Sequence, residues 1–568
     1  MKIAILTFTL FCLPQMAHAA AILEGERAHP VEAANGMVVS SHFLATEEAL
    51  AVLRSGGNAI DAAVTAAFAL AVTQPRSGNI GGGGFILISS EKSGRVVAID
   101  YREKAPAAAT RDMFLDIGGQ VEKNRSRYTH LAAGVPGTVA GLVLALEKYG
   151  SISLADALAP AIRLARGGFI VTPRFSKGLK DRQKSLRRWP ASYRTFYKPD
   201  GSYYEPGDRF RQPQLVKTLE RIAESGHAGF YQGETADLIV AEMERNGGLI
   251  THDDLKKYRA VERQPVKGSY RGHDVYSMTT PSSGGIHILQ LLNILEGWPL
   301  AEYGHNTART IHLMAEAMKR AYADRSAFLG DSDFVAVPIA GLTSKAYARH
   351  LRNGIDSNQA TPSVEIKPGR AADFESDETT HFSIVDGYGN AVSNTYTINF
   401  SYGSGIVVAG AGFLLNNEMD DFSAKPGVPN AYGLLGGEAN RIEGGKRMLS
   451  SMSPTIVKKD NRNFLVTGSP GGSRIITTTL QVILNVIDHR MNIQSAVNAP
   501  RIHHQWLPYE IRVEQGISAD TIDILQKAGH AVKQKSAMGA IQSILIPSRG
   551  VFQGAADPRR STSLAAGY

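Results

Sequence analysis

The chain has 568 residues, of which 43% are hydrophobic and 20% are charged, and its formal net charge is +8. Acidic and basic residues are interspersed, and the one basic cluster, at residues 182–188, is interpreted as a solvated helix face, so the charge gives no reason to expect nucleic-acid binding. The only cysteine, Cys12, lies in the N-terminal apolar segment, which excludes disulfides, thiolate catalysis and cysteine zinc sites from the mature chain.

The N-terminus predicts a secretory signal peptide over residues 1–19. Lys2 is followed by an apolar run at residues 3–13 and by the small residues Ala17 and Ala19. The run is too short to span a bilayer, and the alternative is a buried N-terminal helix. We therefore expect cleavage near Ala19, a periplasmic or secreted protein, and no membrane span in the mature chain.

The first half of the chain predicts both helices and strands. An alanine-rich helical region covers residues 45–73, with a break at residues 55–57. A glycine-rich run at residues 77–84 precedes two strand candidates, at residues 85–89 and 96–101. Helical patterns follow at residues 139–149, 215–224 and 308–328.

The composition changes at about residue 355. Residues 355–378 are polar and end in an acidic run, which is typical of a mobile linker. Strand candidates at residues 380–385 and 391–400, separated by a turn at residues 387–390, predict a hairpin directly after the linker. Further strands are predicted at residues 456–459 and 464–467, and further helices at residues 475–486 and 519–528.

Thr379, at the junction of linker and hairpin, is a candidate nucleophile. A threonine hydroxyl needs a base, and an N-terminal threonine carries one in its own α-amine, whose unperturbed pKa is about 7.7 to 8.0. Thr379 would become N-terminal only if the chain were cut after Glu378, by attack of its hydroxyl on the Glu378 carbonyl. The alternative from the local pattern is that Thr379 simply begins a strand.

Ordered motifs along nearly the whole mature chain resemble the γ-glutamyltranspeptidases, which are N-terminal nucleophile hydrolases. The motifs in the second half are TTHFSIVD at 379–386, TYTIN at 395–399, LNNEMDDFS at 415–423, LSSMSPT at 449–455 and TGSPGGSR at 467–474. Those in the first half are SGNIGGGGF at 77–85, DYRE at 100–103 and GVPG at 134–137.

The resemblance implies an α+β fold, a four-layer αββα sandwich built from the two subunits of one cleaved precursor. The large subunit would span residues 20–378 and the small subunit residues 379–568, and the two would stay together as a heterodimer. The family's chemistry assigns Thr379 as nucleophile, Thr397 as the threonine that supports it, and Gly471 and Gly472 as the oxyanion hole. No metal or other cofactor is expected.

The resemblance also implies a pocket for a γ-glutamyl group, which carries an α-carboxylate and an α-ammonium. Arg102 can grip the carboxylate bidentately, and Ser450 and Ser451 can add hydroxyl donors. Glu418 and Asp421 can hold the ammonium, with help from Asn399. Residues 426–437 resemble a lid loop over this pocket, and Tyr432 would be its gate residue.

The expected substrates are glutathione and other γ-glutamyl compounds, with amino acids, dipeptides or water as acceptors. One alternative is a glutaryl or cephalosporin acylase of the same fold, whose substrate has no ammonium and would not need Glu418 and Asp421. A second is a phosphate-binding enzyme, suggested by Gly81 to Gly84, although that run lacks the spacing of known phosphate loops; the glycines are interpreted as close packing beneath the site. A third is a non-enzymatic binding protein, which would need no cleavage at Thr379.

Overall fold

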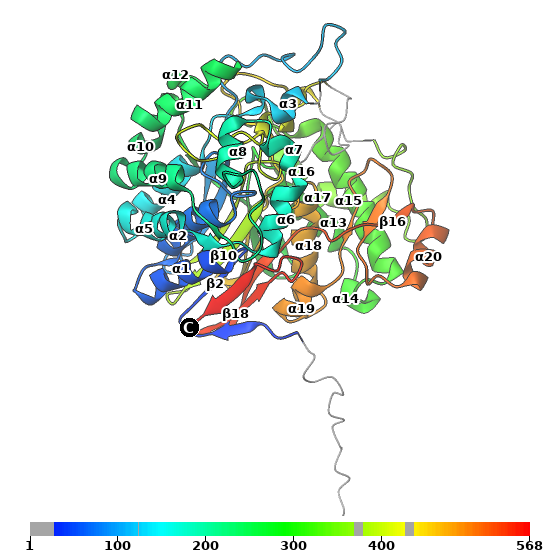
Figure 1. Cartoon of the computed structure of the whole chain (residues 1–568). Coiled ribbons are helices and arrows are strands. Elements are labelled where there is room, and N and C mark those ends of the chain that lie inside the picture. The colour runs from blue at the N-terminus through cyan, green and yellow to red at the C-terminus, as the bar shows by residue number, and fades with distance from the viewer. Residues whose placement is uncertain (1–27, 123, 368–378, 426–436) are drawn as a thin grey trace, which may run out of the picture.

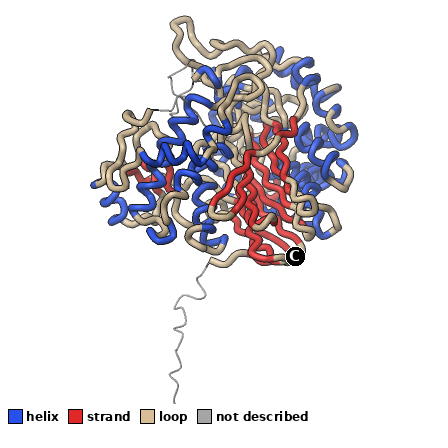
Figure 2. The backbone as a smooth tube through the Cα atoms, turned by 180° about the vertical axis from the view of Figure 1, so that it is seen from behind, coloured by secondary structure: helices blue, strands red, loops and turns tan. Residues whose placement is uncertain are grey.

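Two seven-stranded antiparallel sheets lie face to face at the centre of the molecule, with helices on either side (Figures 1 and 2). The computed structural model describes residues 28–122, 124–367, 379–425 and 437–568. The predicted signal peptide, Glu378 and Tyr432 lie outside these ranges. The arrangement is the predicted four-layer αββα sandwich.

The first sheet, here called the β10 sheet, combines strands from both sides of residue 379. Its spatial order is β19 (Leu564–Gly567), β2 (Gly36–Ser40), β10 (Thr380–Asp386), β11 (Ala391–Thr397), β3 (Gly83–Ser89), β4 (Val96–Tyr101) and β7 (Val261–Arg263). The central hairpin of β10 and β11 is therefore hydrogen-bonded on its two outer edges to strands β2 and β3 of the first half.

The second sheet, here called the β12 sheet, packs against the first. Its spatial order is β1 (Val31–Ala33), β18 (Val551–Ala556), β17 (Gln542–Ser548), β13 (Arg462–Thr467), β12 (Thr455–Lys459), β9 (His273–Ser277) and β8 (Val266–Tyr270). Between the two sheets lies one apolar cluster, in which Phe85 and Leu87 of one sheet share a core with Ile456, Val466 and Ile544 of the other.

Helices cover the outer face of the β10 sheet. They are α1 (Phe43–Arg54), α2 (Ala59–Thr73), α4 (Thr138–Tyr149), α5 (Leu154–Gly167) and α9 (Pro213–Ser225). Every residue of α2 is buried, because its small alanine side chains let it pack closely on neighbours all round. The α2 helix begins at Asn58, whose side chain forms a reciprocal capping box with Asp61.

A second helical layer covers the β12 sheet. It contains α13 (Gly284–Leu295), α15 (Ala308–Phe328), α17 (Lys345–Asn353), α18 (Arg474–Ile487) and α19 (Ile493–Asn498). Beside it lies a three-stranded sheet of β14 (Ile502–His503), β15 (Ile511–Val513) and β16 (Val532–Gln534), with α20 (Ala519–Lys527). Further helices at the periphery are α11 (Gly233–Asn246), of 14 residues, and the shorter α6 (Pro173–Asp181), α8 (Pro190–Phe196), α10 (Ala228–Tyr231) and α12 (His252–Lys257).

The predicted helices and strands are confirmed with small shifts at their ends. The predicted helices at 139–149 and 308–328 correspond to α4 and α15, and the hairpin corresponds to β10 and β11. Strand β11 ends at Thr397 rather than at residue 400, because Asn399 has a φ of 69°, which extended strand geometry does not allow.

The glycine run after α2 allows the backbone approaches that the sequence analysis expected. A Cβ on Gly81 would lie 2.1 Å from the Leu414 carbonyl oxygen, and one on Gly82 would lie 1.9 Å from the Thr397 carbonyl oxygen. Because no side chain fits there, this run packs directly beneath the segment that carries Thr397.

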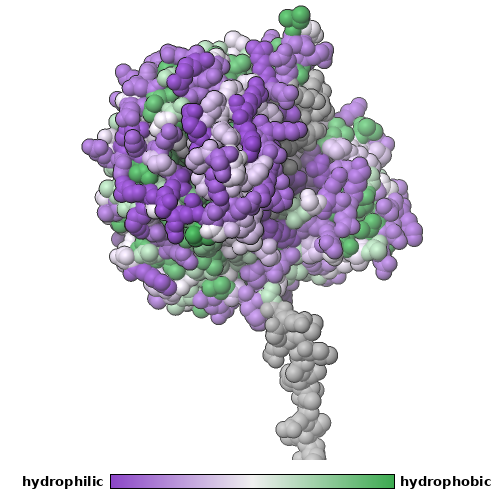
Figure 3. Space-filling model, viewed as in Figure 1, coloured by the Kyte–Doolittle hydropathy of each residue, from purple (hydrophilic) through white to green (hydrophobic). Residues whose placement is uncertain are grey.

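The outer surface in view is mostly hydrophilic, with small separate apolar patches (Figure 3). None of the helices in the described part of the chain combines the length and hydropathy that crossing a bilayer requires.

Candidate active site

Thr379 directly precedes the central strand β10, and only 4% of it is exposed. Thr380 is paired with Tyr396 on β11, so the next position along each strand places Thr379 beside Thr397. The Thr397 hydroxyl accepts a hydrogen bond from the Asn399 backbone N–H at 2.8 Å. The predicted nucleophile and its predicted supporting threonine therefore meet at the end of the hairpin.

Most of the predicted site residues line one small cavity at this place. The lining residues are Arg102, Thr379, Thr397, Glu418, Asp421, Ser450, Ser451, Met452, Gly472 and Ile475. Gly471 directly precedes the lining residue Gly472, and Asn399 lies two residues after Thr397, but neither lines the cavity itself. Sequence reasoning missed Met452, although it lies inside the matched motif at 449–455, and Ile475, in the first turn of α18.

Arg102 follows the last residue of β4 and is 1% exposed. It forms ion pairs with Glu418 and Asp421, and it donates to the Met448 carbonyl at 3.2 Å and to the Leu449 carbonyl at 3.3 Å. A fifth contact joins its Nη1 to Glu103 at 3.4 Å. A guanidinium has five N–H donors, so every one of them already has an acceptor.

Three buried carboxyl groups surround this guanidinium. Burial raises the pKa of Glu418 and Asp421, the latter to about 6, and it raises the pKa of Glu103 to about 7, while Arg102 opposes each rise. One oxygen of each group, Glu103 Oε1, Glu418 Oε2 and Asp421 Oδ1, has no hydrogen-bond partner among the described residues. Buried acceptors without donors are costly, and a ligand with several N–H groups would satisfy them. The sequence analysis had not assigned a role to Glu103.

Gly471 and Gly472 precede α18, and their φ angles are 135° and 59°. These left-handed values favour glycine, and they bring the chain to the N-terminal end of a 14-residue helix. Backbone N–H groups at a helix N-terminus carry partial positive charge. The arrangement fits a site that stabilises a developing oxyanion, the role predicted for both glycines.

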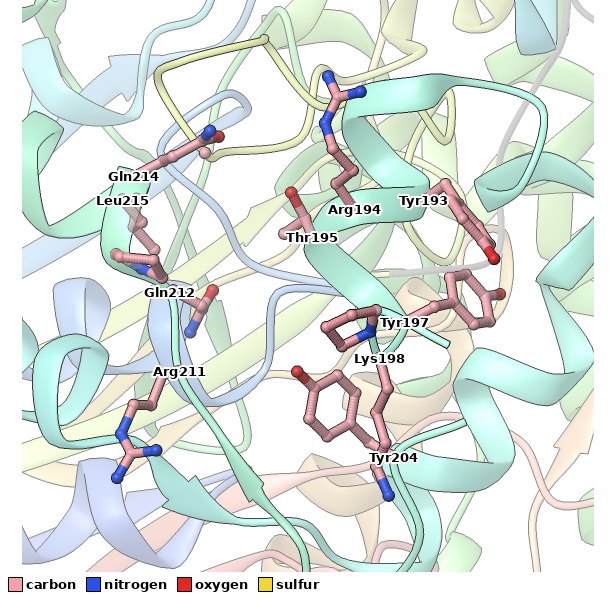
Figure 4. A pocket seen from close by; sticks show the side chains of 13 residues that line it. Tyr193, Arg194, Thr195, Tyr197, Lys198, Tyr204, Arg211, Gln212, Gln214 and Leu215 are labelled. Carbon is pink, nitrogen blue, oxygen red and sulfur yellow. The ribbon is translucent and has the colours of Figure 1, made fainter. Parts of the chain in front are cut away.

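A larger pocket lies elsewhere, between α8 and the start of α9, where Thr195 and Tyr204 face Gln212 across an opening (Figure 4). Its lining contains three cationic side chains, Arg194, Lys198 and Arg211, but no carboxylate, histidine, serine or cysteine. No predicted site residue lines it.

One set of metal-capable side chains occurs in the described ranges and was not anticipated from the sequence: His312, Glu316 and His530. The Nδ1 atom of His312 lies 2.8 Å from Nε2 of His530, and Glu316 pairs with both Lys319 and Arg320. Two cations already neutralise the carboxylate, so the set forms a self-contained buried network.

Comparison with known proteins agrees with this geometry. The family model described as gamma-glutamyltranspeptidase matches residues 45–567. The glutathione hydrolase proenzyme of Escherichia coli (strain K12) is 54% identical over 540 residues, covering 95% of this chain and 93% of that protein.

Solved structures show the same fold. A cephalosporin acylase from Bacillus halodurans superposes with a TM-score of 0.86 at 30% identity and covers 98% of this chain and 99% of that one. A γ-glutamyltranspeptidase from Helicobacter pylori is 48% identical with a TM-score of 0.58, covering 58% of this chain and 94% of that one. The resemblance drawn from the motifs is thereby confirmed: the chain belongs to the gamma-glutamyltranspeptidase family and is an enzyme of that family.

Proposed function

We propose that the protein cuts its own chain between Glu378 and Thr379, and that Thr379 then transfers the γ-glutamyl group of compounds such as glutathione to amino acids, dipeptides or water. The observation that carries this proposal is one cavity lined by Thr379, Arg102 and the buried carboxyl groups of Glu418 and Asp421, with a third buried carboxyl group, Glu103, in contact with Arg102.

Self-cleavage would proceed through an ester. The Thr379 hydroxyl oxygen attacks the Glu378 carbonyl carbon, the peptide nitrogen leaves as the α-amine of Thr379, and water hydrolyses the resulting ester. The products are a large subunit, residues 20–378, and a small subunit, residues 379–568. They stay together because β10 and β11 of the small subunit are paired to β2 and β3 of the large one.

In the transfer reaction the free α-amine takes the proton of the Thr379 hydroxyl as its oxygen attacks the γ-carbonyl carbon. Backbone N–H groups at Gly471 and Gly472 stabilise the oxyanion, and Thr397 supports the nucleophile. The leaving amine takes up the proton and departs, which leaves a γ-glutamyl ester on Thr379. An acceptor amine or water then attacks that ester and frees the enzyme.

The substrate would be recognised by an exchange of ion pairs. Arg102 is fully engaged with Glu418 and Asp421, so a substrate carboxylate can reach it only if those contacts are replaced. A zwitterionic γ-glutamyl group supplies both halves of the exchange: its carboxylate takes the guanidinium, and its ammonium takes the released carboxylates, Glu103 among them. Asn399 would assist, since its Oδ1 is buried without a partner in the described ranges.

Two further parts of the proposal rest on the sequence. The N-terminal segment supports export to the periplasm or the medium. Residues 426–437 would form a lid with Tyr432 as gate, and a lid that excludes water favours transfer to an amine over hydrolysis.

A second candidate is a glutaryl or cephalosporin acylase, which the likeness to the acylase from Bacillus halodurans favours. A glutaryl group lacks the ammonium, so the carboxyl groups that its carboxylate displaces from Arg102 would have no substrate cation to bind. We therefore expect a higher kcat/KM for γ-glutamyl-p-nitroanilide than for glutaryl-p-nitroanilide, and the opposite order would favour the acylase.

The decisive experiment is intact-mass analysis of purified protein and of its Thr379→Ala variant. The unaltered protein should give two polypeptides with the break before Thr379, and the variant should give one uncut, inactive chain because no hydroxyl is present to attack. Thr379→Ser is the matched control: it keeps a hydroxyl and should still be cut. Two polypeptides from Thr379→Ala would show that another group makes the cut.

A further inference from the structure

A second buried arginine, Arg325, lies behind the cavity in the last turn of α15 and is 1% exposed. Its Nε donates to the Ser283 hydroxyl oxygen at 2.8 Å, and its Nη2 donates to the Ser451 hydroxyl oxygen at 3.1 Å. Ser283 is the residue before α13, whereas Ser451 lines the cavity. Arg325 therefore ties the outer helical layer to the wall of the site.

The contacts of Arg325 determine which way the two hydroxyl groups point. A guanidinium only donates, so both serine oxygens must accept. The Ser283 hydrogen then goes to the Ser450 carbonyl at 2.8 Å, an oxygen that also accepts the Ser283 backbone N–H at 2.7 Å.

The Ser451 hydroxyl has a hydrogen to donate but only a weak partner. In the described part of the chain its hydrogen-bond acceptor is Ser283 Oγ at 3.4 Å, which is a long distance for a hydrogen bond. The Ser451 hydroxyl would therefore donate preferentially to a charged acceptor bound in the cavity. Ser450 is placed alike, because its hydroxyl oxygen accepts the Met452 backbone N–H at 3.1 Å. Two hydroxyl donors thus face the cavity on the side of Arg102.

Arg325 also supplies charge to a strongly acidic site. Burial raises the pKa of Asp421 to about 6, and Arg102 and, more weakly, Arg325 oppose that rise. The positive field of Arg325 therefore reaches the cavity, where it favours a bound anion as well as ionised carboxylates.

We propose that Arg325 is a positioning residue that orients the Ser451 hydroxyl as a donor to the substrate's α-carboxylate and so makes the enzyme selective for acyl groups that carry one. The inference rests on the proposed γ-glutamyl function and deepens it, because it adds to carboxylate recognition by Arg102 a residue that does not touch the substrate.

The test measures kcat/KM for three p-nitroanilides with Arg325→Met and Arg325→Lys. The γ-glutamyl compound has carboxylate and ammonium, the glutaryl compound only the carboxylate, and the 4-aminobutanoyl compound only the ammonium. Losing an oriented, charge-assisted donor should lower kcat/KM about 10- to 100-fold for the first two, mainly through KM, and leave the third nearly unchanged. Arg325→Lys should recover part of the loss.

A double variant separates positioning from general damage. With Ser451→Ala already present, Arg325→Met should add little for the γ-glutamyl compound, because its effect passes through the same hydroxyl. Fully additive losses, or equal losses for all three substrates, would overturn the assignment. Arg320→Met is the matched control, a buried arginine on the same helix that pairs with Glu316, and it should leave the substrate preference unchanged.

Two further measurements keep the outcomes distinct. If the Arg325 variants fail to fold, Ser283→Ala removes one anchor of the guanidinium and should shift the preference in the same direction; an unchanged preference would overturn the proposal. If the unaltered enzyme cleaves no γ-glutamyl compound, the proposed function fails. If the unaltered enzyme cleaves γ-glutamyl compounds and Arg325→Met keeps the same substrate preference, only the role of Arg325 is disproved.

Discussion

The side chain of Arg102 has different partners from those that the sequence suggested for an arginine that binds a substrate carboxylate. It was expected to face the substrate, and Glu418 and Asp421 were expected to face the substrate's ammonium separately. The structure pairs them with one another, so that the arginine partly offsets the charge of the carboxyl groups around it. Binding of a zwitterion then exchanges ion pairs instead of creating new ones, which limits the desolvation cost that buried charges otherwise impose.

Removing Arg102 should therefore harm binding more than cleavage of the chain. Arg102→Ala should raise KM for γ-glutamyl substrates by an amount equivalent to roughly 2 to 5 kcal/mol, because a buried bidentate contact is lost. Steady-state kinetics and a denaturing gel together test this expectation. Arg102→Lys keeps the charge without the planar guanidinium, so its KM should lie between those of the unaltered enzyme and Arg102→Ala.

The exposed Arg111, which pairs with Glu438, offers a control of the same residue type. Arg111→Ala should leave KM unchanged. If Arg102→Ala also left KM unchanged, Arg102 would have no part in substrate binding.

At the level of elements, the glycine run at residues 81–84 decides how closely the layers approach. Backbone carbonyls of Leu414 and Thr397 lie where Cβ atoms of Gly81 and Gly82 would stand. The Gly82 carbonyl also accepts the backbone N–H groups of Gly137 and Thr138 at the start of α4. One loop thus holds both a helix N-terminus and the end of β11 that carries Thr397.

Gly82→Ala should disturb this junction. The added methyl group would clash with the backbone of Thr397, so we expect a loss of about 1 to 3 kcal/mol in stability together with lower kcat, measured by thermal unfolding and turnover. Gly341→Ala is the matched control, since no atom lies within 4 Å of a Cβ at that position. A normal kcat in Gly82→Ala would show that this loop does not affect the position of the catalytic groups.

Across the whole molecule, many histidines are buried without charge. Burial lowers the pKa of His42 to about 4 and the pKa values of His287, His381, His503 and His530 to about 3. An unfolded chain takes up these protons near pH 6.5, whereas the folded chain resists until about pH 3 to 4. The unfolded state thus binds more protons in that window, so stability should fall as the pH falls from about 6.5.

His42 offers a clean test, because its ring also caps α1 by accepting the Leu44 N–H at 3.3 Å. Asparagine caps helices as well but does not titrate. His42→Asn should therefore make the acid-side loss of stability shallower by about 1.4 kcal/mol per pH unit between about pH 6.5 and pH 4.

Apparent unfolding midpoints across that range measure the effect. The exposed His252→Asn serves as control and should leave the slope unchanged. An unaltered slope in His42→Asn would mean that His42 takes up its proton in the folded protein at the same pH as in the unfolded chain.

The sequence by itself determined the local elements and the family, and it led to the proposal of Thr379 as the nucleophile. The hairpin after Thr379 and the alanine-rich helices follow from short-range patterns, and the motifs identified the family because they are long and ordered. Strands β2, β17 and β18 were not predicted. All five residues of β2 and the first five of β17 are buried, so their sequences have no reason to alternate between apolar and polar residues. In β18 burial alternates over the first four residues, but the sequence VFQGAA does not alternate in polarity.

Only the tertiary structure decided which of the matched residues lie together. Arg102, Thr379, Glu418 and Ser451 are separated by long stretches of chain, and they meet because β4, β10 and the loops around them are aligned by two stacked sheets. The pairing of Arg102 with its carboxylates, the part of Glu103 and the hold of Arg325 on Ser451 are long-range contacts. Such contacts depend on packing between layers, and no local sequence pattern encodes them.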